Sequence, residues 1–348
     1  MHIHDALAQL IDGRPLGERG CESVFEQMLE GSLDHAQIGA LLGMIQARGP
    51  SVDELVGAAR VMRRHVQPVG APEDPARPVI DTCGTGGAPK TFNVSTAAAL
   101  VVAGARAEPG SGVERVLVAK HGNRSRTGRG SAEVLQTLGV NVDAPTETQS
   151  RCLDEAGLCF CFAIHHHPAA RHAAPVRRSL GVPTMFNLLG PLTNPARCSR
   201  QLLGVWDGRF VEPLAHALQR LGSERAWVVH SDDGLDELSI TAPTRVGVVA
   251  GGRVELERVD PRALGLACDS LEPLRARDVE HAAGMVRLIL EDKPGAPTDM
   301  TLLSAGAALL VAGAASSLES GVELARESIR SGRAAQALRD LARLSHER

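Results

Sequence analysis

The sequence contains few aromatic residues, and several other features are missing. Phe, Trp and Tyr make up 2% of the 348 residues, and there is no tyrosine. Single-stranded nucleic acids stack on such side chains and need a basic surface, whereas the net charge here is −4, so we expect no nucleic-acid partner. No apolar run reaches transmembrane length, and residues 1–6 show no signal-peptide pattern. These absences predict a cytoplasmic protein without a membrane partner.

Cysteine pairs and metal-ligand clusters are also missing. The seven cysteines are scattered without a Cys-x-x-Cys pair, which favours free thiols in a reducing compartment. Cys159 and Cys161 stand in an apolar, strand-like run, where buried thiols are expected. Three adjacent histidines, 165–167, have no cysteine or carboxylate at ligand spacing beside them and should point in different directions, which argues against zinc.

The periodicity of the apolar residues changes along the chain. Residues 1–70 read as helices, with Ile38, Leu41, Leu42 and Ile45 on one face and a capping-box pattern at Ser51. Prolines at 68, 72, 75 and 78 then mark a linker. Residues 76–348 alternate strands and helices, which predicts a mostly parallel α/β sheet. We therefore expect a small helical domain, 1–70, and a larger α/β domain, 76–348.

A glycine-rich turn follows the first expected strand. Residues 79–84 are apolar and β-branched, Gly84, Gly86 and Gly87 follow, and a helix run begins after Ser95 and Thr96. This order of strand, turn and helix N-terminus suits phosphate, because unpaired amides and the positive helix end face the anion. Walker A and dinucleotide-binding patterns both fail at Pro89. A plain strand-to-helix turn remains the alternative.

A second glycine-rich loop is strongly basic. It follows an expected strand at 116–119, begins at Lys120 and ends at Ser131, which we expect to cap a helix through Leu138. Its arginines are Arg124, Arg126 and Arg129. Because the carboxyl ends of parallel strands meet at one edge of a sheet, both loops should lie together and bind anions. The alternative is a solvated charged loop.

Two adjacent carboxylates, Asp236 and Glu237, follow an expected strand at 225–230. Hard oxygen ligands near phosphates are typical of Mg²⁺ sites, and a surface acidic turn is the alternative.

Elsewhere we expect a turn-rich apolar run at 186–195. We also expect helices at 169–180, 211–221, 300–312 and 321–344, strands at 157–163 and 201–206, and a hairpin at 245–259.

These pieces together resemble a known family. In chain order they are Gly84-Thr-Gly-Gly, Thr91-Phe-Asn-Val-Ser-Thr96, Lys120-His-Gly-Asn-Arg-Ser125, His167-Pro, Ala174-Pro-Val-Arg-Arg178, 186–195 and Asp236-Glu-Leu-Ser239. Over nearly its whole length the chain is similar to the anthranilate phosphoribosyltransferases, of the glycosyltransferase/nucleoside-phosphorylase-like family. The resemblance implies a helical domain that includes part of 165–195 and forms a homodimer. It also implies transfer of phosphoribosyl from phosphoribosyl pyrophosphate (PRPP) to anthranilate, with pyrophosphate released, in tryptophan biosynthesis.

The resemblance also implies residue roles. The donor would be bound by Gly84, Gly86, Gly87, Thr91, Asn93, Ser95, Thr96, Lys120, Arg124, Ser125, Arg129 and Ser131. Two Mg²⁺ ions would be held with the help of Ser95, Asp236 and Glu237. The acceptor would pass His121, Asn123, His167 and Arg177, and Arg177 would pair with its carboxylate. The resemblance implies no dedicated catalytic base.

The sequence departs from the family pattern in places. Ala88-Pro89 replaces the usual Asp-Gly, which removes a carboxylate from the pyrophosphate region, and residues 106–115 read as an insertion. Three alternatives therefore stay open: a related transferase with another acceptor, a nucleoside phosphorylase, and a non-catalytic paralogue that binds nucleic acid.

Overall fold

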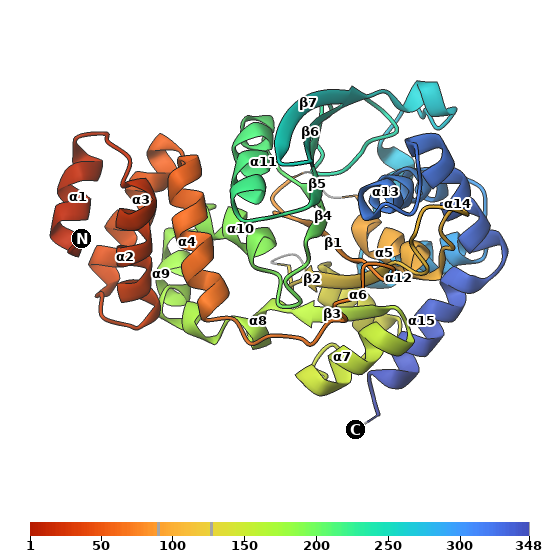
Figure 1. The fold of residues 1–348 in the computed structure, drawn as a ribbon, viewed down its shortest axis with the longest axis horizontal. Helices are drawn as coiled ribbons and strands as arrows, with labels where there is room; N and C mark the ends of the chain where they lie inside the picture. Colours follow the sequence, from red (N-terminus) through yellow and green to blue (C-terminus); the bar gives the residue numbers. More distant parts are fainter. Residues whose placement is uncertain (89–90, 126–127, 348) are drawn as a thin grey trace.

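The structure is a computed structural model that describes residues 1–88, 91–125 and 128–347. Pro89, Arg126 and Thr127, which the sequence analysis assigns to the two loops, lie outside the described residues. Figure 1 shows a helical bundle formed by the N-terminal residues beside a larger body built around a sheet. Within the described ranges, no helix combines the length and the apolar character needed to cross a bilayer.

The first part of the bundle is helical, as predicted, and consists of four helices. They are α1 (Ile3–Ile11), α2 (Gly17–Leu29), α3 (His35–Arg48) and α4 (Val52–Arg64). Capping boxes start α3 at Asp34 and α4 at Ser51, the second of which the sequence analysis expects. The predicted apolar face of α3 is fully buried. Local capping and periodicity therefore define these helices well.

A later segment of the chain packs against this bundle. It consists of α8 (Ala163–His166), η1 (Pro168–His172), α9 (Ala174–Leu180), α10 (Met185–Leu189) and η2 (Gly190–Thr193). Val176 and Phe186 belong to the same buried cluster as Phe25 and Leu41 of the bundle. The run 186–195, expected to be turn-rich, forms short helices, because Pro191 begins a new turn that the preceding helix cannot continue.

The larger body contains a seven-stranded sheet in the order β3-β2-β1-β4-β5-β6-β7 among the described residues. The strands are β1 (Val79–Gly84), β2 (Leu117–Gly122), β3 (Leu158–Phe162), β4 (Arg200–Gly204), β5 (Arg225–Ser231), β6 (Thr244–Ala250) and β7 (Arg253–Val259). β1 to β5 pair in parallel, and β6 and β7 form the predicted antiparallel hairpin. The mostly parallel sheet is thus confirmed.

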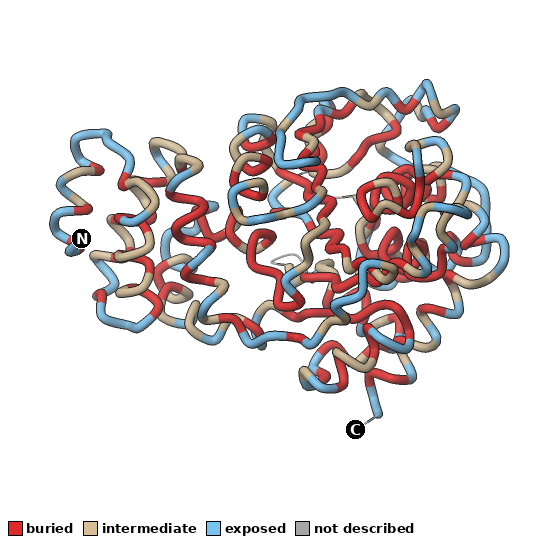
Figure 2. Tube along the Cα trace, in the orientation of Figure 1, coloured by how far each residue is buried: buried red, intermediate tan, exposed pale blue. Residues whose placement is uncertain are grey.

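Helices cover both faces of this sheet. Side chains alternate along β5, so that Trp227 and Val229 join one buried cluster whereas Ala226 and Val228 join the other. The first cluster includes α5 (Val94–Gly104) and the C-terminal helices, and the second includes α11 (Val211–Arg220) and the bundle. Figure 2 shows that most of the central strands and of α13 is buried. The remaining elements are α6 (Ser131–Thr137), α7 (Thr146–Glu155), η3 (Gly208–Phe210), η4 (Pro261–Leu264), η5 (Glu272–Leu274), α12 (Val279–Leu290), α13 (Ala296–Ala312), α14 (Leu318–Arg330) and α15 (Arg333–Leu344).

Several local expectations are wrong. Lys120 lies inside β2 rather than at the start of a loop, because its side chain finds buried acceptors. Ser131 is the first residue of α6 and caps nothing, since Gly130 precedes the helix. The helix expected at 321–344 is two helices, separated at Gly332, which adopts a φ of +74°. A helix that was not predicted, α12, forms at Val279–Leu290.

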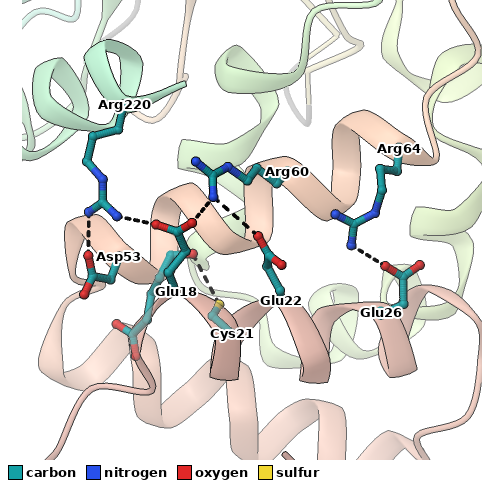
Figure 3. A network of polar contacts seen from close by, with 9 residues as sticks. Glu18, Cys21, Glu22, Glu26, Asp53, Arg60, Arg64 and Arg220 are labelled. Carbon is teal, nitrogen blue, oxygen red and sulfur yellow. Dashed lines mark hydrogen bonds and ion pairs between the residues drawn. The ribbon is translucent and has the colours of Figure 1, made fainter. Parts of the chain in front are cut away.

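Ion pairs join the bundle to the sheet body. Arg220 of α11 contacts Glu18 of α2 and Asp53 of α4, and Arg60 of α4 also contacts Glu18. Figure 3 shows these groups converging, with Arg64 and Glu26 paired further along the same helices. Arg63 adds hydrogen bonds from α4 to the carbonyls of Leu192 and Leu221. The bundle is therefore fixed to the body by charged and polar groups as well as by apolar packing.

Candidate active site at the carboxyl edge of the sheet

The two glycine-rich loops lie side by side, as predicted. β1 and β2 are parallel neighbours, so the loops that follow them leave the same edge of the sheet. The Asn93 side chain, just before α5, donates a hydrogen bond of 3.3 Å to the carbonyl of Arg129 in the second loop. The relative position of the loops is therefore fixed by a direct contact as well as by the strand order.

The first loop needs its glycines for conformation. Gly86 and Gly87 have φ values of +65° and +105°, which favour glycine, and a Cβ on Gly87 would stand 3.6 Å from the Trp206 side chain. Thr91 and Ser95 are partly buried, and Thr96 is buried at the start of α5 with no hydrogen-bond partner for its hydroxyl among the described residues. The predicted donor-binding residues of this loop thus surround the N-terminus of α5.

The acidic turn after β5 lies directly over the end of the first strand. Gly84 and Gly204 are paired in neighbouring strands, and a Cβ on Gly84 would stand 3.1 Å from Oδ2 of Asp236. A Cβ on Gly204 would stand 1.7 Å from the Asp236 carbonyl oxygen, so only glycine fits there. This close approach brings the predicted metal ligands to the glycine turn.

Asp233 holds the acidic turn in shape. Its carboxylate accepts hydrogen bonds from the hydroxyls of Ser231, Ser239 and Thr241 and from the Leu235 amide. Burial acts to raise the pKa of Asp233, but these donors outweigh it and hold the pKa below its usual value. The turn is therefore a built structure rather than a loose acidic loop.

Glu237 faces the N-terminus of α5. Burial raises its pKa to about 8, the neighbouring Asp236 charge adds to the effect, and Lys120 and the Ser95 amide oppose it. The Ser95 amide acts to lower the pKa of this carboxylate, which places Glu237 close to the N-terminus of α5. Two carboxylates and the Ser95 hydroxyl thus gather at one place.

Lys120 is a buried cation beneath this group. The residue is 3% exposed, and Nζ donates to the carbonyl of Thr82 at 2.7 Å and to Oγ of Ser95 at 3.0 Å. Asp81, which is fully buried, supplies a neighbouring negative charge and accepts the His121 amide at 3.0 Å. Burial raises the pKa of Asp81 and lowers that of Lys120.

The predicted acceptor residues form a second group around α10. His121 Nδ1 lies 3.1 Å from the carbonyl oxygen of Gly190, and His121 Nε2 lies 3.2 Å from Nε2 of His167. Asn123 is exposed just beyond β2, two residues after His121. The three adjacent histidines diverge as expected: His165 contacts Asp143, and His166 contacts Gln67 and Gln149.

Arg177 of α9 also lies against α10. Its guanidinium lies 4.8 Å from the centre of the Phe186 ring, and burial lowers its pKa. Within the described part of the chain it has neither an ion pair nor a hydrogen bond from its side chain. A partly desolvated guanidinium of this kind is suited to a carboxylate ligand.

Several described residues of the basic loop contact other parts of the protein or of the loop. Arg129 contacts the carbonyl of Ala276, and its amide donates to Ser125 Oγ at 3.1 Å. Arg124 lies 5.7 Å from the centre of the Phe162 ring, and Ser131 Oγ donates to the Asn123 carbonyl at 3.5 Å. The loop is therefore more than a solvated charged segment.

Sequence reasoning missed several supporting residues. Asp81, Asn194 and Asp233 make polar contacts from buried or partly buried positions, and Asn194 donates to the Ala119 carbonyl at 2.8 Å. The signal for Asp81 was a carboxylate inside an apolar strand, because charged residues are rarely buried without a partner. For Asp233 the signal in the sequence was Ser239 and Thr241, which follow it by six and eight residues.

Comparisons with known proteins agree with this arrangement. A family model described as "Glycosyl transferase family, helical bundle domain" matches residues 4–66, and one described as "Glycosyl transferase family, a/b domain" matches residues 76–335. The anthranilate phosphoribosyltransferase of Rubrobacter xylanophilus is 47% identical over 99% of this chain and 97% of its own. That of Azorhizobium caulinodans is 45% identical over 95% of this chain and 93% of its own.

Solved structures extend the comparison. The anthranilate phosphoribosyltransferase of Thermus thermophilus has a TM-score of 0.89 at 38% identity, covering 99% of this chain and all of the other (100%). The Saccharomyces cerevisiae enzyme, solved in complex with PRPP and Mg, shares the fold with a TM-score of 0.86 at 23% identity, over 99% of this chain and 97% of its own. The chain therefore belongs to the anthranilate phosphoribosyltransferase family of glycosyl transferases.

Proposed function

We propose that the enzyme transfers the phosphoribosyl group of PRPP to anthranilate and releases pyrophosphate, a step of tryptophan biosynthesis. The observation that carries the proposal is the junction of three parts at one sheet edge. The Asn93–Arg129 hydrogen bond joins the two glycine loops, and Asp236 lies over Gly84 at the base of the first loop. Family membership supports the same activity.

The donor is bound at the α5 side of this edge. Backbone amides at a glycine turn and a helix N-terminus favour a multiply charged anion, and Lys120 adds a buried positive charge beside Ser95. We assign pyrophosphate and ribose binding to the residues of the first loop and of α5. The second loop contributes through Arg124, Ser125, Arg129 and Ser131.

Magnesium fits the acidic turn by the chemistry of its donors. Mg²⁺ is commonly held by one or two carboxylates and completed by water and substrate phosphates. Asp236, Glu237 and Ser95 supply oxygens of this kind, whereas no three His, Cys, Asp or Glu side chains cluster into a full metal cage among the described residues. Burial chiefly raises the pKa of Glu237, and repulsion from the Asp236 carboxylate adds to the effect. We propose that these residues hold two Mg²⁺ ions together with the donor, and bound magnesium would stabilise charge on the departing pyrophosphate.

The acceptor lies on the α10 side. Arg177 is available for a bidentate contact with the anthranilate carboxylate, which lysine could not make. His121, Asn123 and His167 line the path of its ring. An acceptor held by its carboxylate in this way approaches the donor with its amine directed at the anomeric carbon.

The chemistry then depends on positioning and charge. The amine of anthranilate is already a nucleophile, so the main task is to stabilise the leaving pyrophosphate and to align the two substrates. In other enzymes, each well-aimed donor contributes about 3–4 kcal/mol to such a transition state. The buried Lys120 and the amides near Ser95 are fixed before the substrates bind, which is the arrangement that makes such donors effective.

The proposal is tested by a turnover assay. Anthranilate fluorescence should fall when the enzyme, PRPP and Mg²⁺ are mixed with it, and the product should appear in equal amount. A nucleoside with inorganic phosphate serves as the control for phosphorylase activity. Turnover of the nucleoside without consumption of anthranilate would overturn the proposal in favour of the phosphorylase alternative.

Assembly and location are further parts of the proposal. We propose a cytoplasmic homodimer that associates through the helical domain, 1–70, together with part of 165–195. Ile11, on α1 of the bundle, is 71% exposed, so a charge placed there would lie on the surface of the helical domain. Sedimentation of the wild type and of Ile11→Glu tests this, with a monomeric wild type as the contradicting result.

A further inference from the structure

The hydrogen bonds around His121 fix the position of two protons. Nδ1 of His121 faces the Gly190 carbonyl oxygen, which can only accept, so this nitrogen carries a hydrogen. In a neutral imidazole, Nε2 of His121 then has only a lone pair. Its partner at 3.2 Å, Nε2 of His167, must therefore be the donor. It follows that Nδ1 of His167 is left with a free lone pair.

The surroundings keep both rings neutral. Burial lowers the pKa of His167 to about 4, and the neighbouring His166 adds to the effect. Burial also holds the pKa of His121 well below its usual value, with His167, His166 and Lys120 acting in the same direction. The described residues offer His167 Nδ1 no hydrogen-bond partner. A neutral, unpaired nitrogen is thus available to a ligand at neutral pH.

The position of α10 relates the His121–His167 pair to the acceptor. Arg177 lies against Phe186 in α10, and His121 contacts Gly190, which directly follows the same helix. Phe186 and Gly190 are four residues apart, or about 6 Å along a helix axis. In anthranilate the amine is ortho to the carboxylate, so a molecule that pairs with Arg177 has its amine within a few ångströms of that carboxylate. This step rests on the proposed function.

We propose that Nδ1 of His167 accepts the proton that the anthranilate amine loses, and that His121 positions His167 by fixing its tautomer. The amine lone pair forms the bond to C1 of the ribose, and the C1–O bond breaks with its electrons leaving on pyrophosphate. The surplus proton of the new nitrogen passes to His167, which becomes an imidazolium and releases the proton to solvent. His167 is then a catalytic residue, beyond the acceptor-lining role that the resemblance implies.

The premise can be tested without substrate. In ¹⁵N-histidine NMR spectra, the enzyme should show His121 protonated at Nδ1 and His167 protonated at Nε2 at pH 7. A His167 protonated at Nδ1 would overturn the proposal even if the enzyme is active. His121→Leu should abolish the preference of His167 for protonation at Nε2. His121→Asn, whose side-chain oxygen can still accept a hydrogen bond from His167, should retain this preference.

The catalytic step is tested by single turnovers with excess enzyme. His167→Ala should slow the chemical step about 100-fold, with donor affinity unchanged, as for the loss of a general base. Added imidazole should restore part of the rate. An unchanged rate, or a slow rate that imidazole does not restore, would overturn the proposal, because a packing defect is not repaired by a base.

A second variant guards against misfolding of the first. His167→Asn retains a donor to His121 but offers no base, so it should be as slow as His167→Ala while folding normally. A wild-type rate in His167→Asn would contradict the proposal. Wild-type turnover is measured in the same experiment. A wild type that is inactive on anthranilate would contradict the proposed function itself, whereas an active wild type with an equally fast His167→Asn contradicts only the role of His167.

Discussion

Lys120 and His121 are adjacent in β2, and their side chains leave the strand on opposite faces of the sheet. Lys120 Nζ contacts Ser95 in α5 at 3.0 Å, whereas His121 Nδ1 contacts Gly190 after α10 at 3.1 Å. Side chains alternate along a strand, so two neighbours serve two different sites. One end of one strand thus connects the donor side of the proposed active site with its acceptor side.

Lys120 should be as important for stability as for binding. Lys120→Met leaves the buried Asp81 without its neighbouring positive charge, and we expect a loss of about 3 kcal/mol in the free energy of unfolding. Adding Asp81→Asn should recover much of this loss, because both charges are then removed. Urea unfolding of the two single variants and the double variant measures the coupling. Additive losses would show that the two charges do not interact.

The acidic turn should control the response to magnesium. Asp236→Asn with Glu237→Gln should lower turnover at least about 100-fold at limiting Mg²⁺ and leave the fold intact. Asp232→Asn is the matched control, since this carboxylate belongs to the same turn but pairs with Arg258 outside the site. Rates at limiting Mg²⁺ that match the wild type would reject the metal role.

Arg177 should act on the acceptor rather than on the donor. Removing a charge-assisted hydrogen bond costs about 1.5–3 kcal/mol, so Arg177→Ala should raise the KM for anthranilate roughly 10- to 100-fold. The KM for PRPP should stay near the wild-type value. Arg178→Ala, an exposed neighbour on α9, is the control and should change neither. Equal losses for both substrates in Arg177→Ala would count against the carboxylate contact.

The buried histidines predict a stability change in weakly acidic solution. The folded-state pKa of His167 is about 4, and an unfolded histidine titrates near 6.5, so only the unfolded chain takes up a proton between these values. The stability that His167 contributes is therefore complete above about pH 6.5 and is lost as the pH falls toward 4.

Comparison with His167→Asn isolates this contribution from other titrating groups. The stability of the wild type relative to the variant should fall by about 2 kcal/mol between pH 7.5 and pH 5. Unfolding in urea at both pH values measures the difference. A constant difference would mean that His167 titrates normally in the folded enzyme.

The sequence predicts the sheet, the bundle and the neighbouring loops because these depend on periodicity, capping and strand order. It places Lys120 in a loop, because lysine is ordinarily exposed and its acceptors, Thr82 and Ser95, come from distant positions. The role of Gly190 as the partner of His121 likewise depends on tertiary contact. The sequence pattern does not predict the short helices at 185–193, because each is too short to show a helical period.

The central claim is that one sheet edge binds the donor and its metal between the acidic turn and the N-terminus of α5. A crystal of the enzyme grown with PRPP and Mn²⁺, in place of Mg²⁺, tests it through the anomalous signal of the metal. We predict a signal beside Asp236, Glu237 and Ser95, with the pyrophosphate against the Gly84 turn. Donor bound elsewhere, or a metal signal remote from this turn, would contradict the account.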